Sequence, residues 1–228
     1  MKLFPSQRVN REQTILSRTQ SAEGLQLLGD FHPLLAQLGS VEGLLSLSAA
    51  AALVRQPMVS SLEALSIFLA AYRSEILLPL ELPTICRAYH HARHNQSREL
   101  VVLDREVSGQ PLLRDLASAS RRVGQSQLRR LRPLRDDRLV QRYIQAVDQE
   151  EAQGWHTLVY GLTLALYSLP LRQGLMNYAR KTFSGFVHAA APSLNLSEHD
   201  CRQLLDVASA DLPRRLEPML AGESISGK

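Results

Sequence analysis

Apolar residues recur at helical spacing along most of this chain, and no stretch sustains the strict alternation of apolar and polar residues that is typical of a strand. The most apolar stretch runs from Trp155 to Leu205, and almost every residue between His156 and Ala191 is apolar, small or aromatic. A helix that is apolar nearly all round belongs inside a bundle. Pro170 lies where a second helix would begin. The pattern therefore predicts a buried helical hairpin at the core of an all-helical domain.

The other helices follow from the same periodicity, with glycine and proline marking their ends. The expected segments are Arg11–Leu28, Leu34–Val54, a helix capped by Ser60 or Ser61 and interrupted at Pro79 and Pro83, Thr84–His94, Glu99–Val107, Leu112–Leu131, Arg138–Gln153 and Ser197–Leu220. Together they predict an all-α, single-domain bundle of roughly eight to ten helices. We expect this domain to span residues 11–220, with flexible tails at 1–10 and 221–228.

Composition and charge narrow the class of protein. A chain of 228 residues with 45% hydrophobic and 21% charged residues is typical of a soluble globular domain. No apolar run reaches the roughly 18 residues of a membrane helix, and the N-terminus lacks the apolar core of a secretory signal. These features predict a cytoplasmic protein that does not enter the membrane. Cys86 and Cys201 are expected to be reduced thiols.

The basic residues are almost all arginines, and they outnumber the acidic residues by 26 to 22. Arginines are dense between Arg121 and Arg132, which is one feature of a nucleic-acid-binding surface. Acidic residues flank this run, however, and no stacking aromatic residues accompany it. A solvated helix face or a surface for a protein partner is therefore the favoured interpretation.

No motif of a known catalytic or phosphate-binding loop is present in the sequence. His90 and His94 lie one helical turn apart, which is the spacing of a two-histidine metal site, but no further ligand lies close in sequence. An exposed helix end is the favoured interpretation of this pair. His156, at the start of the apolar hairpin, is either catalytic or, more commonly for such a position, a satisfied core histidine. The sequence thus favours an interaction protein over an enzyme, and no cofactor is expected.

Several segments, taken in order, resemble the UreF family of urease accessory proteins. One family helix is matched in register within Arg114–Gly124, by Arg114, Leu116, Ala119, Ser120 and Gly124. The entrance to the hairpin is matched by His156, Gly161 and Leu162, and the helix that follows by Tyr178, Ser184, Gly185, Val187, Ala189 and Ala190. The closing segment is matched by Leu196, Asp200, Leu204 and Leu205.

The chain also departs from the family pattern. The early signature is largely lost: Pro33, Ser40, Gly43 and Leu44 fit only with a gap, and Leu45 replaces its glutamate. The closing segment carries Glu198, Cys201 and Arg202 in place of two glutamines and a glycine, Ala117 replaces an arginine, and Arg180 stands where a second tyrosine is frequent. The usual arginine-containing C-terminal tail is not found before Lys228. A divergent member, a truncated chain and a relative with altered partners are all compatible with these differences.

The resemblance implies a non-catalytic scaffold that forms a homodimer. Proteins of this kind bind the UreD/UreH accessory protein and the UreG GTPase, and the assembly supports nickel insertion into apo-urease. We expect the dimer and partner surfaces on the exposed faces of the helices over Leu112–Leu131 and Leu171–Ala191. The candidate partner-binding residues are Arg114, Arg121, Tyr178, Arg180 and Lys181. The remaining family-motif residues, Ser120, Gly124, His156, Gly161, Ser184 and Gly185, are expected to be structural.

Three alternatives remain open from the sequence. Tyr178 is as well explained as a core residue as it is by partner contact. The whole chain could be a regulatory or adaptor module unrelated to urease, binding nucleic acid through Arg121–Arg132. It could also be a metal-binding protein that uses His90 and His94.

Overall fold

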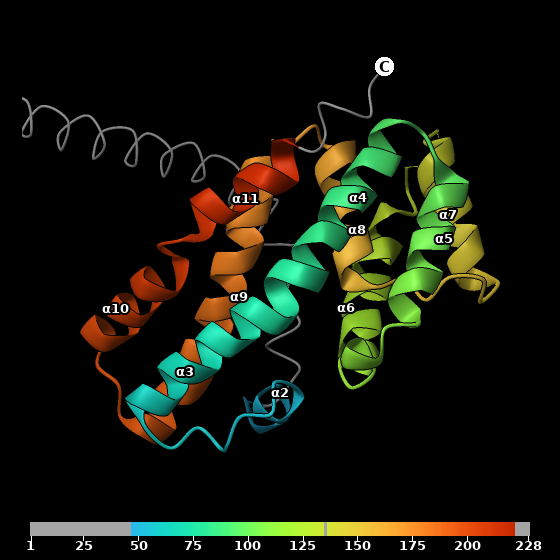
Figure 1. The fold of residues 1–228 in the computed structure, drawn as a ribbon. Helices are drawn as coiled ribbons and strands as arrows, with labels where there is room; N and C mark the ends of the chain where they lie inside the picture. The colour runs from blue at the N-terminus through green and yellow to red at the C-terminus, as the bar shows by residue number, and fades with distance from the viewer. Residues whose placement is uncertain (1–46, 135, 222–228) are drawn as a thin grey trace, which may run out of the picture. The chain divides into compact units, whose positions relative to one another are not determined.

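The computed structural model describes residues 47–134 and 136–221, and every regular element in these two ranges is a helix (Figure 1). The all-α prediction is confirmed. The expected N-terminal tail at 1–10, the helix over residues 11–28, most of the helix over residues 34–54 and the altered early signature all lie outside the described residues. Of the expected C-terminal tail at 221–228, only Ala221 is described, and it is the last residue of a helix. The boundaries of the domain therefore stay a prediction.

The helices follow one another with short connections. In chain order they are α2 (Leu47–Leu53), α3 (Leu62–Tyr72), the π-helix η1 (Arg73–Glu81), α4 (Leu82–Arg93), α5 (Ser97–Ser108), the 3₁₀ turn η2 (Pro111–Leu113), α6 (Ala117–Leu131), α7 (Arg138–Asp148), α8 (His156–Leu166), α9 (Leu171–Leu194), α10 (Glu198–Ser209) and α11 (Leu212–Ala221).

Helices α3 and α4 form one continuous rod through the π-helix η1 (Figure 1). Ser61 caps its start, as expected, by accepting a hydrogen bond from the amide of Ala64 at 3.1 Å. The expected interruption at Pro79 and Pro83 is wrong. Pro79 lies inside the π-helix, whose wider turn accommodates a residue that has no amide hydrogen, and Pro83 lies in the first turn of α4, where proline is tolerated.

Three predicted helices differ from their expected bounds. The segment over residues 197–220 is divided into two helices: α10 ends at Ser209, and α11 begins at Leu212. The segment over residues 112–131 is divided: η2 ends at Leu113, a turn follows, and α6 begins at Ala117. Leu113 and Leu116 are both buried across this turn, and their three-residue spacing matches the tighter winding of a 3₁₀ turn. Helix α7 ends at Asp148 instead of residue 153, because Glu150 adopts a left-handed conformation with φ of 60°.

The predicted buried helices α8 and α9 are both present, with Pro170 at the N-cap of α9. Every residue of α8 from His156 to Ala165 is buried. The two helices nevertheless pack more extensively against other helices than against each other. Helix α8 packs chiefly against α4 and α6, whereas α9 packs chiefly against α10 and α4. The core is thus built by the rod of α3, η1 and α4 together with both members of the hairpin.

Close approach of α8 to α4 depends on Gly161. A Cβ atom at this position would overlap the carbonyl oxygen of Ile85 and would lie 2.9 Å from the Cβ of Ala88. Because main-chain atoms of a packed helix cannot move aside cheaply, only glycine fits. None of the helices in the described part of the chain is long and apolar enough to cross a membrane.

Candidate functional site

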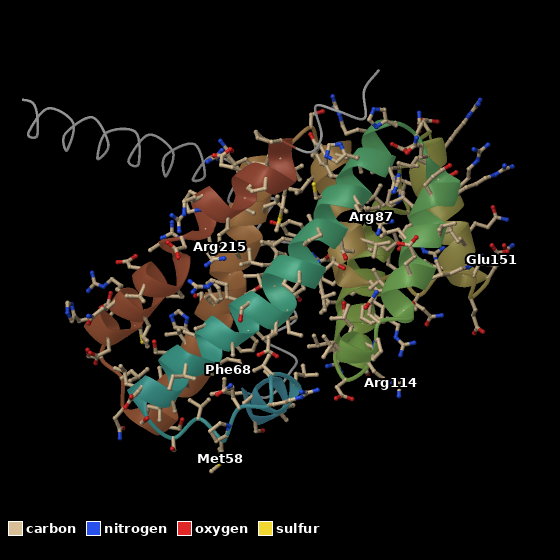
Figure 2. The ribbon with its side chains drawn as sticks, in the orientation of Figure 1. Met58, Phe68, Arg87, Arg114, Glu151 and Arg215 are labelled. Carbon is tan, nitrogen blue, oxygen red and sulfur yellow. The ribbon has the colours of Figure 1, made fainter. Side chains whose placement is uncertain are left out.

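The family-motif arginines before and within α6 have different surroundings. Arg114 is exposed in the turn that precedes the helix (Figure 2). Arg121 is half-buried: its Nε donates to the carbonyl of Ala117 at 3.1 Å, and its Nη1 donates to Oε1 of Gln153 at 2.6 Å. Arg121 therefore braces the loop between α7 and α8, and Arg114 is the more accessible of the two.

Tyr178 lies inside the molecule, with 4% of its surface exposed. Its hydroxyl donates to Oε1 of Glu81 at 3.0 Å. Tyr178 therefore does not lie on an exposed surface, and its interpretation as a core residue fits the structure. Its neighbours Arg180 and Lys181 are only half-buried on the same helix.

The outer face of α9 is a polar strip at helical spacing. Asn177, Arg180 and Ser184 are half-buried, and His188 is exposed one turn further on. Nδ1 of His188 lies 3.0 Å from Oγ of Ser184 and 2.7 Å from the Ser184 carbonyl oxygen. Gly185 is half-buried beside this strip. We call Asn177, Arg180, Lys181, Ser184 and His188 the α9 strip.

Behind the α9 strip lies a buried polar cluster centred on Glu81, the last residue of η1. Oε1 of Glu81 accepts hydrogen bonds from the hydroxyl of Tyr72 at 3.3 Å and from that of Tyr178 at 3.0 Å. The ring of Tyr178 lies 5.7 Å from that of His156 and 5.1 Å from that of Tyr160, measured between centroids. We call these residues the Glu81 cluster; it joins η1, α8 and α9.

His156 is fully buried in this cluster, with no exposed surface. Its main-chain amide donates to Oγ of Ser120 at 3.1 Å, which attaches the start of α8 to α6. Tyr160 lies one turn further along α8, and burial raises its pKa so that it remains protonated; its hydroxyl donates to the carbonyl of Gly174 at 3.0 Å. The surroundings of His156 are those of a core histidine.

Gly124 explains why α6 approaches the start of α8 so closely. A Cβ atom there would overlap the carbonyl oxygen of Gly154 and lie 2.7 Å from the amide nitrogen of His156. The motif residues Ser120 and Gly124 thus lie one turn apart on the face of α6 that meets α8. Ser120 accepts a hydrogen bond from the main-chain amide of His156, and Gly124 leaves room for the main chain before and at the start of α8.

A second buried carboxylate, Asp104 on α5, was not identified from the sequence. Its carboxylate is fully buried and accepts hydrogen bonds from the hydroxyl of Tyr143 at 2.7 Å and from the amides of Gln153 and Gly154 at 2.6 and 3.0 Å. We call this arrangement the Asp104 clamp. It fixes the loop between α7 and α8, in which Gly154 has φ of +72°.

Burial raises the pKa of Asp104 above its usual value, and the hydrogen bonds from Gln153, Tyr143 and the loop backbone oppose that rise only in part. The sequence did contain a signal for this residue. Asp104 occupies an apolar position in α5, in line with Leu100, Leu103 and Val107, which are all buried. An acidic residue in the apolar stripe of an amphipathic helix indicates a buried carboxylate with partners elsewhere.

The candidate metal pair does not gather further ligands. His94 caps α4, and its Nδ1 lies 2.8 Å from the main-chain oxygen of His90. Within residues 47–134 and 136–221, no group of three or more His, Cys, Asp or Glu side chains is arranged to hold a metal ion. Cys86 and Cys201 are buried free thiols.

Comparison with known families decides the identity of the chain. The UreF family model matches residues 59–208, which extend from the start of α3 to the end of α10. The chain belongs to the UreF family. No curated protein sequence gives a significant match to it.

Membership of the UreF family gives this protein an accessory role in the urease system. Proteins of this family are accessory proteins and are generally not catalytic. The matched range contains the Glu81 cluster, the Asp104 clamp and the α9 strip. It excludes the altered early signature, which precedes residue 59. The Glu81 cluster and the Asp104 clamp position helices and a loop, so that the accessible side chains of the α9 strip remain as candidates for partner binding.

Proposed function

We propose that this UreF-family protein is a non-catalytic scaffold in urease maturation. In this role it forms a homodimer in the cytoplasm and binds a UreD/UreH-type accessory protein and a UreG-type GTPase. The resulting complex supports insertion of nickel into apo-urease. The match to the UreF family over residues 59–208 is the observation that carries this proposal.

The α9 strip is the surface that we assign to assembly. The opposite face of α9 is committed to the core through Leu175, Ala179, Phe183 and Val187, which have no exposed surface. The strip itself combines the half-buried cations Arg180 and Lys181 with the small residue Ser184, and the half-buried Gly185 lies beside it. Small residues allow close approach of another helix, and half-buried arginine supplies directed hydrogen bonds to carboxylates.

We assign Arg114, in the turn before α6, as a second partner contact. Its side chain is exposed, and it carries the same charge as Arg180 and Lys181. Arg121 holds Gln153 of the loop between α7 and α8. We therefore expect Arg121 to influence partner binding through the position of the loop more than by direct contact.

Size-exclusion chromatography with light scattering tests the proposal. The full chain is measured alone, and then with a UreD/UreH-type protein and a UreG-type GTPase from the same source. We expect a dimer that co-elutes with both partners and is weakened by the double substitution Arg180→Ala/Lys181→Ala. Arg202→Ala on α10 is the matched control, because that side chain is 68% exposed and lies outside the strip.

The outcome separates the competing functions. If the double substitution leaves co-elution unchanged, the partner surface does not lie on the α9 strip. Absence of any complex with the unsubstituted chain would contradict the scaffold function itself. Binding to nucleic acid that weakens steeply with salt would favour the arginine-rich segment over residues 121–132 as the working surface.

A further inference from the structure

A groove of about 570 Å³ runs between α5 and α7, far along the chain from the α9 strip. It lies beside Glu151, which is labelled in Figure 2. Its charged lining consists of Arg98, Arg105, Arg142 and Glu151. The remaining lining residues that the structure describes are uncharged.

The positive charge of this groove is only partly neutralised. Arg105 is held by Glu151: its Nε donates to the main-chain carbonyl at 3.0 Å, and its Nη2 lies 3.6 Å from a carboxylate oxygen. Arg98 and Arg142 are exposed, and within the described ranges neither guanidinium makes a hydrogen bond or an ion pair. Two arginines from different helices thus line one groove with their charge unmatched.

The groove also contains apolar surface. Val102 on α5 is 51% exposed. Val101 is half-buried, and Ala146 on α7 is buried beneath them. The groove therefore combines an apolar floor with arginines along it.

We propose that the α5–α7 groove binds an acidic amphipathic segment of a partner protein. Apolar side chains of that segment contact Val101 and Val102, and its carboxylates receive paired hydrogen bonds from Arg98 and Arg142. The proposal does not depend on which protein supplies the segment. It therefore stands apart from the assignment of urease-maturation partners to the α9 strip.

Protein is favoured over nucleic acid as the occupant because of what lines the groove. Among the lining residues that the structure describes there is no aromatic side chain, so that bases have no ring to stack on, whereas the valines suit aliphatic side chains. The planar guanidinium groups match carboxylates in pairs.

Fluorescence anisotropy with the full chain tests the groove. The probe is a labelled peptide of about 14 residues, roughly 21 Å long as a helix, with leucine on one face and glutamate beside it. A second peptide, the lysine twin, has the same sequence with lysine in place of each glutamate. A mixed-sequence DNA duplex is the third probe. We expect the glutamate peptide to bind and the Arg98→Glu/Arg142→Glu double variant to lower its affinity about tenfold or more.

Matched variants distinguish a specific loss of peptide binding from a loss of folding. Arg98 is the second residue of α5, where a glutamate is favoured by the helix dipole, so that the double variant should fold. Arg122→Glu/Arg214→Glu makes the same charge change at exposed sites outside the groove and should leave peptide affinity unchanged. Val102→Asp, which leaves all arginines in place, should weaken the glutamate peptide as well.

The proposal is overturned if the lysine twin binds as tightly as the glutamate peptide, or if the control pair loses as much affinity as the groove pair. Preferential binding of the DNA duplex through Arg98 and Arg142 would also overturn it. Co-elution with the urease accessory proteins is a separate measurement, so that failure of the peptide titration and failure of the scaffold function can be told apart.

Discussion

Glu81 and Asp104, the two buried carboxylates in the described part of the chain, perform different structural tasks. Glu81 accepts hydrogen bonds from the hydroxyls of Tyr72 and Tyr178 and thereby connects the helical rod to α9. Asp104 accepts one hydroxyl, from Tyr143, and two main-chain amides from the loop between α7 and α8. Glu81 thus sets the spacing of helices, whereas Asp104 determines the conformation of a loop.

This difference has an energetic consequence. A tyrosine that loses its acceptor can rotate its hydroxyl or be replaced by phenylalanine with little change of shape. Main-chain amides have no such freedom, and a buried amide without an acceptor costs about 1–3 kcal/mol. We therefore expect the Asp104 clamp to contribute more to the stability of the fold than either tyrosine contact of Glu81.

Asp104→Ala should have the largest effect. Three donors lose their acceptor at once, so that we expect the free energy of unfolding to fall by about 3–5 kcal/mol. Urea denaturation followed by circular dichroism measures this change. Asp148→Ala is the matched control: its carboxylate is 50% exposed in a pair with Arg132, and its loss should cost less than about 1 kcal/mol. Equal losses in the two variants would contradict the clamp.

Gly124→Ala tests the side of the clamped loop that faces α6. The added methyl group would meet the carbonyl oxygen of Gly154, and because both partners are held by main-chain packing we expect a loss of about 2–3 kcal/mol. Gly109→Ala is the control, since its Cβ would lie 3.4 Å from the nearest atom outside its own neighbours. If Gly124→Ala is no worse than Gly109→Ala in the same denaturation assay, the loop is not rigid.

Tyr178→Phe weakens the Glu81 cluster while keeping its shape. Removal of one hydroxyl should lower the free energy of unfolding by about 1 kcal/mol. Tyr72→Phe should cost less, because its hydrogen bond to Glu81 is longer, 3.3 Å against 3.0 Å. Because Tyr178 is buried, co-elution with the accessory proteins should persist in Tyr178→Phe. Loss of the complex in a variant that remains folded would restore Tyr178 as a direct partner contact.

The change of the free energy of unfolding with pH should be the smallest of these effects. We expect it to arise from Asp104 and not from Glu81. Burial raises the pKa of Asp104 in the folded protein above its usual value of 3.8. Between the two pKa values the folded state binds more protons than the unfolded state, so that this contribution is fully present below pH 3.8 and is lost as the pH rises through the folded pKa.

Comparison of the wild-type protein with Asp104→Asn isolates this contribution. Urea midpoints are measured for both proteins from about pH 4 to about pH 7. The stability of the wild type relative to the variant should decrease with rising pH over this range. If the difference is constant or grows with pH, the hydrogen bonds lower the pKa of Asp104 at least as much as burial raises it.

The local pattern of the sequence was sufficient for several features. It predicted the all-helical class, a cap at Ser60 or Ser61, the apolar helix that begins at His156 and the start of α9 after Pro170. These depend on neighbours within about four residues, which is the range over which helical periodicity and capping act. The motif residues Ser120 and Gly124 were likewise recognised, although only the structure explains why they are required.

Features that depend on distant parts of the chain were missed. The sequence predicts an interruption at Pro79, because local spacing does not indicate a π-helix that continues the rod. It does not identify Asp104 as a core carboxylate, since the partners of Asp104 lie 39 to 50 residues away. It is equally compatible with a core and a surface position for Tyr178, whose contact with Glu81 lies 97 residues distant.

The sequence by itself determined that this protein is helical, where most helices begin, and which family it resembles, because these properties are carried by short-range spacing and by residues in register. Only the tertiary structure decided which polar side chains are buried. A carboxylate or a tyrosine becomes a core residue when distant donors and acceptors satisfy it, and that pairing is created when the helices pack.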